Sequence, residues 1–178
     1  MYYGNIKFND IANGEGVRTS LFVSGCTHHC KNCFNPETWD FCYGKIFDQN
    51  TIDEILQSLN HEYINGLTLL GGEPMEKANQ MSLLPLVKQV KKQYPNKTIW
   101  CYTGYIFDKD LKKEGKVFTE WTDELLKYID VIVDGEFVED LKDITLRFKG
   151  SANQRIIDVQ KSLKTGNIVL SPYNEKRK

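Results

Sequence analysis

The chain has 178 residues, a formal net charge of −1 at pH 7, 40% apolar residues and 12% aromatic residues. This composition predicts one globular domain over 1–178, with about 173–178 as a flexible tail. A nearly neutral chain lacks the positive charge of a typical nucleic-acid-binding surface, so no nucleic-acid partner is expected. The sequence shows neither a secretory leader nor an apolar run of 18 residues, so we expect a cytoplasmic protein without a membrane segment.

Short β-rich runs alternate with helical stretches along the chain. The first strand is expected at Arg18–Ser24, just before a cysteine-rich loop. A helix capped by Thr51 or Asp53 should run to about Asn60. The further elements expected, in chain order, are a strand at Gly66–Leu70, a helix at Met81–Tyr94, a strand at Thr98–Tyr102, a helix at Thr122–Tyr128, a strand at Asp130–Val133, and short strands at Arg155–Val159 and Ile168–Leu170.

This order predicts an α/β fold with a mostly parallel sheet and crossover helices. Because a complete (β/α)8 barrel takes ~250 residues, the length favours a partial, open (β/α) barrel with about five parallel strands. Ligands of such sheets bind at the carboxyl ends of the strands. Polar or glycine-rich loops follow the main strands there, namely the cysteine loop, Gly71–Pro74, Thr103-Gly104 and Asp134-Gly135. We therefore expect a single site at that edge.

The cysteine loop carries the strongest chemical signal. Cys26, Cys30 and Cys33 form a C-x3-C-x2-C run, and thiolates are preferred ligands of zinc and of iron–sulfur clusters. A structural zinc site or an ordinary iron–sulfur cluster has four protein ligands, and this run supplies only three thiolates. In a [4Fe–4S] cluster, one iron would then be open to a small molecule. The alternative is a closed zinc site whose fourth ligand is one of three nearby side chains, His28, His29 or Cys42.

A second motif follows the strand expected at Gly66–Leu70. Gly71 and Gly72 allow the backbone to approach a ligand closely, and the Glu73 carboxylate can accept a hydrogen bond from an ammonium group. Pro74 fixes the exit of the loop. In isolation these residues also describe an ordinary strand-to-helix turn, so their interpretation depends on the cysteine loop.

Together the two motifs resemble the radical S-adenosylmethionine (SAM) superfamily. The segment C-F-N-P-E-T-W-D at 33–40 is similar to the C-x-N-x-x-T-W segment of the enzymes that activate glycyl-radical enzymes. The short chain, N-D-I-A-N-G-E-G-V-R-T at 9–19 and R-F-K-G-S-A-N-Q-R-I-I-D at 147–158 resemble the activating proteins of anaerobic ribonucleoside-triphosphate reductases. The likeness covers about residues 3–160. One departure is Asn32, where many radical SAM proteins have an aromatic residue.

The resemblance implies an oxidoreductase with one [4Fe–4S] cluster on Cys26, Cys30 and Cys33, and with SAM on the fourth iron. Such an enzyme cleaves SAM reductively to a 5′-deoxyadenosyl radical, which removes a hydrogen from a glycine of the anaerobic reductase and leaves a glycyl radical there. The implied partners are that reductase and a reduced flavodoxin-type electron donor. The residues implied in SAM binding are Asn32, Cys33, Phe34, Asn35, Gly71, Gly72, Glu73, Thr103 and Asp134, with Glu73 near the amino group.

Two other functions stay open. A non-enzymatic zinc or Fe–S binding module would have a fourth protein ligand or would leave SAM intact. A radical SAM enzyme with a small-molecule substrate would share the cysteine loop, although the 147–158 segment argues against it. That segment is interpreted either as a turn before a short core strand or as a contact to SAM or to the partner. Cys42 and Cys101 receive no cluster role, and Cys101 is expected in the core.

Overall fold

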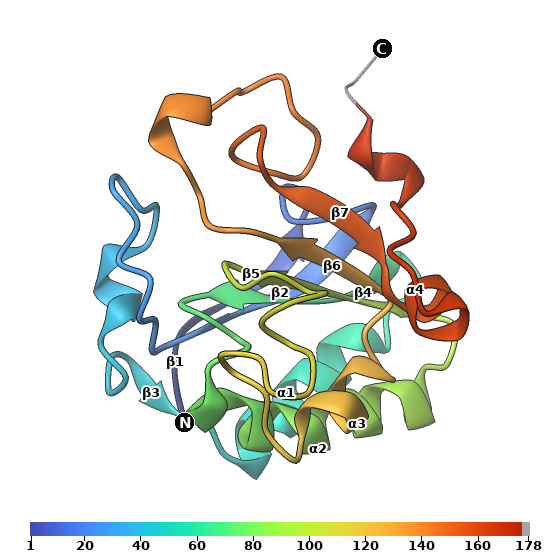
Figure 1. The fold of residues 1–178 in the computed structure, drawn as a ribbon. Coiled ribbons are helices and arrows are strands. Elements are labelled where there is room, and N and C mark those ends of the chain that lie inside the picture. Colours follow the sequence, from blue (N-terminus) through green and yellow to red (C-terminus); the bar gives the residue numbers. More distant parts are fainter. Residues whose placement is uncertain (176–178) are drawn as a thin grey trace.

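In the computed structural model, which describes residues 1–175, a seven-stranded sheet forms the centre of the fold (Figure 1). The strand order is β3-β1-β2-β4-β5-β6-β7. The strands are β1 (Tyr2–Asp10), β2 (Val17–Val23), β3 (Lys45–Ile46), β4 (Ile64–Gly71), β5 (Thr98–Thr103), β6 (Val131–Asp134) and β7 (Arg155–Asp158). The helices are α1 (Gln49–Leu59), α2 (Lys77–Gln93), α3 (Thr122–Leu126) and α4 (Val159–Thr165), with 3-10 turns η1 (Pro36–Trp39), η2 (Glu139–Leu141) and η3 (Pro172–Asn174).

The four central strands β2, β4, β5 and β6 run parallel. The outer strands are antiparallel to their neighbours: β1 to β2, β3 to β1, and β7 to β6. The expected partial barrel with about five parallel strands is therefore wrong, because the sheet is open and mixed. A further parallel strand needs a crossover, usually a helix, whereas 135–154 contains only η2 before β7 returns antiparallel.

Alternation along the strands sends side chains to two different faces of the sheet. Leu21 and Leu69 face the main core, and Figure 1 shows α1, α2 and α3 together on that side. On the opposite face, Trp100 and Ile156 form a small cluster covered by Phe148 and other loop residues. The second face is thus covered by loops, and the loops leave room there for a pocket.

Several predicted boundaries shift: α2 begins at Lys77 instead of Met81, α3 ends at Leu126 instead of Tyr128, and β4 begins at Ile64 instead of Gly66. Two further differences have local reasons. The cap of α1 is Asp48 and not Thr51 or Asp53, because the Asp48 carboxylate accepts the Thr51 N–H at 3.0 Å. The strand expected at Ile168–Leu170 is reduced to an isolated bridge between Ile157 and Leu170. Within 1–175, none of the helices is both long and apolar enough to cross a membrane.

The end of the described chain packs on the loop-covered face. The Tyr173 ring lies 5.5 Å from the Trp100 ring, and the Asn174 side chain accepts the Ile156 N–H at 3.0 Å. The flexible tail expected over about 173–178 includes 176–178, which lie outside the described residues.

A fully buried arginine ties the N-terminal ends of the parallel strands together. The Arg18 guanidinium donates to the Thr68 hydroxyl at 2.7 Å and to the Leu67 and Thr98 carbonyls, each at 2.8 Å. It also lies 5.4 Å from the centre of the Trp100 ring. Burial lowers the pKa of Arg18 to about 10, so the side chain stays charged at pH 7 and its neutral partners stabilise that charge.

We expect Arg18→Leu to lower the free energy of unfolding by about 3 kcal/mol or more, because buried acceptors left without a donor cost ~1–3 kcal/mol each. Urea denaturation monitored by circular dichroism measures the change. The matched control is Arg147→Leu, which removes a half-exposed arginine that pairs with Glu15 and lies over the Phe148 and Tyr173 rings. It should cost less than Arg18→Leu, about 1 kcal/mol or less for the ion pair and about 1 kcal/mol for the ring contacts. Equal losses for the two variants would contradict this role of Arg18.

Candidate functional site

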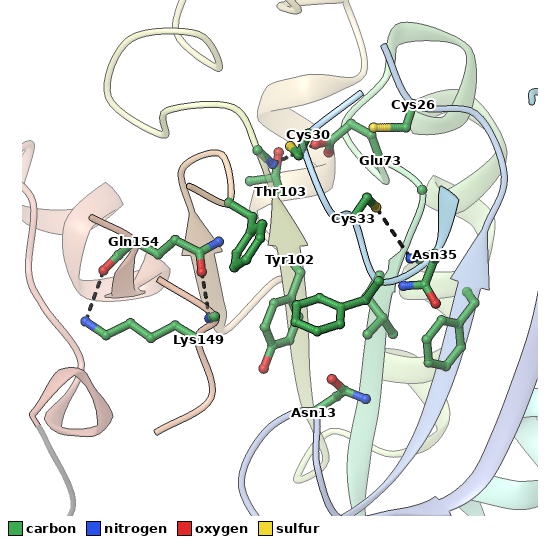
Figure 2. A pocket seen from close by; sticks show the side chains of 18 of the residues that line it. Asn13, Cys26, Cys30, Cys33, Asn35, Glu73, Tyr102, Thr103, Lys149 and Gln154 are labelled. Carbon is green, nitrogen blue, oxygen red and sulfur yellow. Dashed lines mark hydrogen bonds between the residues drawn. The ribbon is translucent and has the colours of Figure 1, made fainter. Parts of the chain in front are cut away.

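A cavity of about 610 Å³ lies at the carboxyl ends of β2, β4 and β5 (Figure 2). Its floor contains Phe22, Leu70 and Tyr102, which stand on three adjacent strands on the face opposite α1–α3. Figure 2 shows Glu73 among the cysteine side chains at one end, with Tyr102 and Asn13 farther along. The size and the mixture of apolar floor and polar rim are typical of a small-molecule pocket.

Most of the residues implied by the resemblance line this cavity. They are Cys26, Cys30, Cys33, Phe34, Asn35, Gly71, Gly72, Glu73 and Thr103. Two do not. Asn32 is exposed, and its φ of 57° lies in the left-handed region, which asparagine tolerates better than an aromatic residue does. Asp134 is fully buried behind the cavity, where its carboxylate accepts from Arg155 and from the Phe107 N–H.

The cysteine loop folds back on the segment that follows it. Gly25, at φ 95°, donates its N–H to the Thr38 carbonyl at 2.8 Å, and the Cys26 N–H donates to the Trp39 carbonyl at 3.2 Å. Inside the loop, the Asn35 N–H donates to the Cys33 thiol at 3.4 Å. Residues 33–40 therefore close the loop, which gives the T-W segment a structural role.

The three thiols are free and differ in burial. Burial raises the pKa of the Cys26 thiol to about 12 and also raises the pKa of Cys30, so metal binding must displace protons from them. Within 1–175, no three His, Cys, Asp or Glu side chains are placed to hold one metal ion. Cys101 is fully buried in the core, as expected.

The side chains considered as a fourth zinc ligand are engaged elsewhere or lie off the cavity. Both ring nitrogens of His28 face carboxylates. The His29 ring stacks on Trp39 at 4.6 Å between centroids, and Cys42 is exposed and outside the cavity lining.

The glycines before Glu73 make room for protein backbone. Gly71 has a φ of 103°, a conformation that favours glycine. A Cβ on Gly72 would lie 2.8 Å from the Gly25 carbonyl oxygen. The Gly72 N–H donates to Val23, and the Glu73 N–H donates to Gly25, each at 2.8 Å. The glycines were expected to let the backbone approach a ligand; in the structure their close contacts join the second loop to the cysteine loop.

The Glu73 carboxylate is almost completely buried and held by two backbone groups. Oε1 accepts the Met75 N–H at 2.8 Å, and Oε2 accepts the Gly104 N–H at 2.7 Å. A third contact comes from the His28 ring, whose Nε2 lies 3.1 Å from Oε2. This fixed carboxylate at the cysteine end of the cavity can accept a hydrogen bond from a cationic group.

His28 is the residue that the sequence analysis missed, since it was considered only as a metal ligand. Its Nε2 faces Glu73, its Nδ1 contacts Glu136, and its side chain is only 5% exposed. Burial alone would lower the pKa of His28, but the hydrogen bonds and charges of Glu73 and Glu136 raise it above its ordinary value. His28, Glu73 and Glu136 lie in three different loops, so no local sequence motif predicts that they meet.

The 147–158 segment braces the loop after β6. The Gln154 side chain donates to the Gly135 carbonyl at 2.9 Å and accepts the Gly150 N–H at 2.8 Å. The Asn153 side chain donates to the Glu136 carbonyl at 2.8 Å. Gly150 and Gln154 also line the cavity, so the segment is both a turn before a core strand and part of the pocket wall.

The chain is similar to known proteins over most of its length. Residues 12–157 match the family described as the 4Fe-4S single cluster domain. The chain is 46% identical over 158 residues to the anaerobic ribonucleoside-triphosphate reductase-activating protein of Pasteurella multocida, covering 88% of this chain and 96% of that protein.

Proteins of the same name from two other sources are similar over most of their length. The Haemophilus influenzae protein is 44% identical over 149 residues, which cover 83% of this chain and 91% of the relative. The protein of Enterobacteria phage T4 is 42% identical over 156 residues, which cover 88% and 93%. The resemblance found in the sequence motifs is confirmed, and the chain belongs to the family of anaerobic ribonucleoside-triphosphate reductase-activating proteins, with an iron–sulfur cluster domain.

Proposed function

We propose that this protein activates an anaerobic ribonucleoside-triphosphate reductase by reductive cleavage of SAM on a [4Fe–4S] cluster. The observation that carries the proposal is the placement of three free thiols and a buried carboxylate at one end of a ligand-sized cavity. Cys26, Cys30 and Cys33 would hold the cluster. A reduced flavodoxin-type protein would supply the electron, and the reaction would take place in the cytoplasm.

The donor set of the cysteine loop fits the proposed cluster. The loop provides three soft thiolates, which suit iron–sulfur clusters. Its thiols are not arranged around one ion in the described chain, whereas in a cluster each thiolate binds a different iron. The N–H of Asn35 already donates to the Cys33 sulfur, a kind of contact that tunes cluster potential.

The chain's own residues would bind and shield the ligand. When bound on Cys26, Cys30 and Cys33, a reduced cluster would supply the electron for reductive cleavage of SAM, the chemistry from which the radical for the reductase would come. Glu73 would accept the ligand's amino group, and Gly71 and Gly72 would set the place of that carboxylate. Phe22 and Tyr102 on the floor would keep water from the reacting atoms.

The two ends of the cavity would serve two different substrates. The cysteine end would take the methionyl part of SAM, near Glu73. The far end, where Figure 2 shows Asn13 and Tyr102, would receive the glycine-bearing segment of the reductase. SAM and the glycine-bearing segment would then both contact the apolar floor of Phe22, Leu70 and Tyr102.

The proposal is tested by anaerobic reconstitution with iron and sulfide, followed by addition of SAM, reductant and the reductase of the same organism. We expect release of 5′-deoxyadenosine and a glycyl doublet of the reductase in electron paramagnetic resonance. Omitting SAM or chelating the iron should remove both signals. A reconstituted protein that holds four irons but yields neither product would contradict the proposal.

A further inference from the structure

We propose that His28 is a positioning residue for the amino group of SAM: its ring fixes the Glu73 carboxylate by a hydrogen bond, and Glu136 holds His28 in turn. The inference rests on the proposed function, because it takes Glu73 as the acceptor of that amino group. It assigns to His28 a role other than ligation of the cluster.

The first argument is the set of hydrogen bonds on Glu73. An ionised carboxylate offers about four acceptor sites. In Glu73, the N–H groups of Met75 and Gly104 and the His28 ring occupy three of them. The carboxylate is therefore held from both oxygens, and about one acceptor site is left for a ligand.

The second argument is burial. Glu73 is 1% exposed, so water does not solvate its carboxylate. A buried carboxylate is costly unless its oxygens are hydrogen-bonded. The His28 ring lies within hydrogen-bonding distance of Glu73, so it solvates the carboxylate before a ligand arrives.

The third argument is that the neighbouring loop is shaped for this ring. A Cβ on Gly104 would lie 2.6 Å from His28 Nε2, so only glycine leaves room for the imidazole there. The Tyr105 ring also packs against the imidazole, with 4.3 Å between the ring centroids. The Thr103-Gly104 turn thus provides both a hydrogen bond to Glu73 and the space for His28.

The fourth argument is the support behind His28. Its Nδ1 contacts the Glu136 carboxylate, and the Glu136 backbone is fixed by the Asn153 side chain. In metal sites, carboxylates that orient a ligating histidine change metal affinity or activity by about 10–100-fold when they are removed, and Glu136 holds His28 by the same kind of contact. A continuous series of contacts therefore connects the loop after β6 to Glu73, through Glu136 and His28.

The test compares His28→Ala with His29→Asn, the adjacent histidine, which is exposed and whose ring stacks on Trp39. Asparagine is chosen because His29 has a φ of 52°. Reconstituted proteins are titrated anaerobically, without reductant, with SAM and with 5′-methylthioadenosine, which lacks the amino-acid part. For His28→Ala we expect four irons per chain, a SAM Kd raised about tenfold or more, and a nearly unchanged Kd for 5′-methylthioadenosine.

A second variant tests the same idea without removing the histidine. Gly104→Ala should displace the imidazole from Glu73 and reproduce the selective loss of SAM affinity. A third variant replaces the ring but keeps a donor. His28→Gln should bind SAM more tightly than His28→Ala, because the glutamine amide can donate to Glu73. His29→Asn should leave both dissociation constants as in the wild type.

Two results would overturn the inference while leaving the proposed function intact. These are an unchanged SAM Kd in His28→Ala, and equal weakening of SAM and 5′-methylthioadenosine. Loss of iron from His28→Ala would make His28 a ligand and would overturn both the inference and the open iron on which the proposed function depends. A wild-type protein that holds four irons but does not bind SAM would instead refute the proposed function.

Discussion

Replacing Cys26, Cys30 or Cys33 singly by alanine is expected to abolish formation of an intact [4Fe–4S] cluster and, with it, all SAM cleavage. Each thiolate would hold a different iron, so no neighbouring side chain can substitute for the one removed. Burial raises the pKa values of Cys26 and Cys30, and a weakened cluster must still compete with protons for the thiols that remain. Iron and sulfide analysis with the visible absorption spectrum measures the loss.

The matched control is Cys42→Ala, because Cys42 is an exposed thiol close in sequence but outside the cavity lining. It should retain four irons and full activity. The assignment of the three ligands would be wrong if Cys42→Ala lost the cluster, or if one of the three alanine variants kept four irons.

Removing the charge of the buried carboxylate should have the second large effect. In Glu73→Gln we expect SAM binding to weaken by about 2–5 kcal/mol, the usual cost of truncating a buried, hydrogen-bonded charge pair. The amide also places a donor against the N–H groups of Met75 and Gly104, which now donate to the carboxylate. Titration of the cluster-loaded protein with SAM measures the loss.

Iron content in Glu73→Gln should stay at four per chain, since Glu73 is not a proposed ligand. The control is Glu37→Gln, an exposed carboxylate in η1, which should change the SAM Kd by less than about twofold. Comparable weakening in both variants would show that the effect is general electrostatics and not a contact of Glu73.

The sequence was sufficient to predict where the cavity lies, because two motifs follow parallel strands. Val23 pairs in register with Gly71, so the cysteine loop and the Gly71–Glu73 turn leave the sheet side by side. Apolar β-rich runs predict such buried strands well. The carboxyl ends of neighbouring parallel strands meet at one edge, which is why the cavity lies where the motifs were expected.

The outer strands escaped prediction because they lack the apolar pattern. β1 is mostly polar or half-exposed, and its pairing with β2 is interrupted near Gly4 and again after Lys7. β3 has only two residues, both exposed. β7 was predicted as a strand, but its direction depends on the irregular connection over 135–154, whose path local propensity does not encode. The prediction of a barrel was wrong because these outer strands pair antiparallel to their neighbours.

Contacts between distant loops were the other limit. Asp134 was expected to face the ligand because it ends β6, but Arg155 on the antiparallel neighbour β7 binds its carboxylate instead. His28 meets Glu73 and Glu136 across 45 and 108 residues of chain. Such pairings depend on tertiary packing, so only the assembled fold could reveal them.

Mössbauer spectroscopy of the protein reconstituted with 57Fe, recorded before and after addition of SAM, tests the central claim most directly. With ligands only from Cys26, Cys30 and Cys33, we expect four irons per chain, one of which changes its isomer shift when SAM binds while the other three stay alike. Four irons with unchanged parameters in the presence of saturating SAM would show that the protein itself closes the fourth position, and would contradict the account.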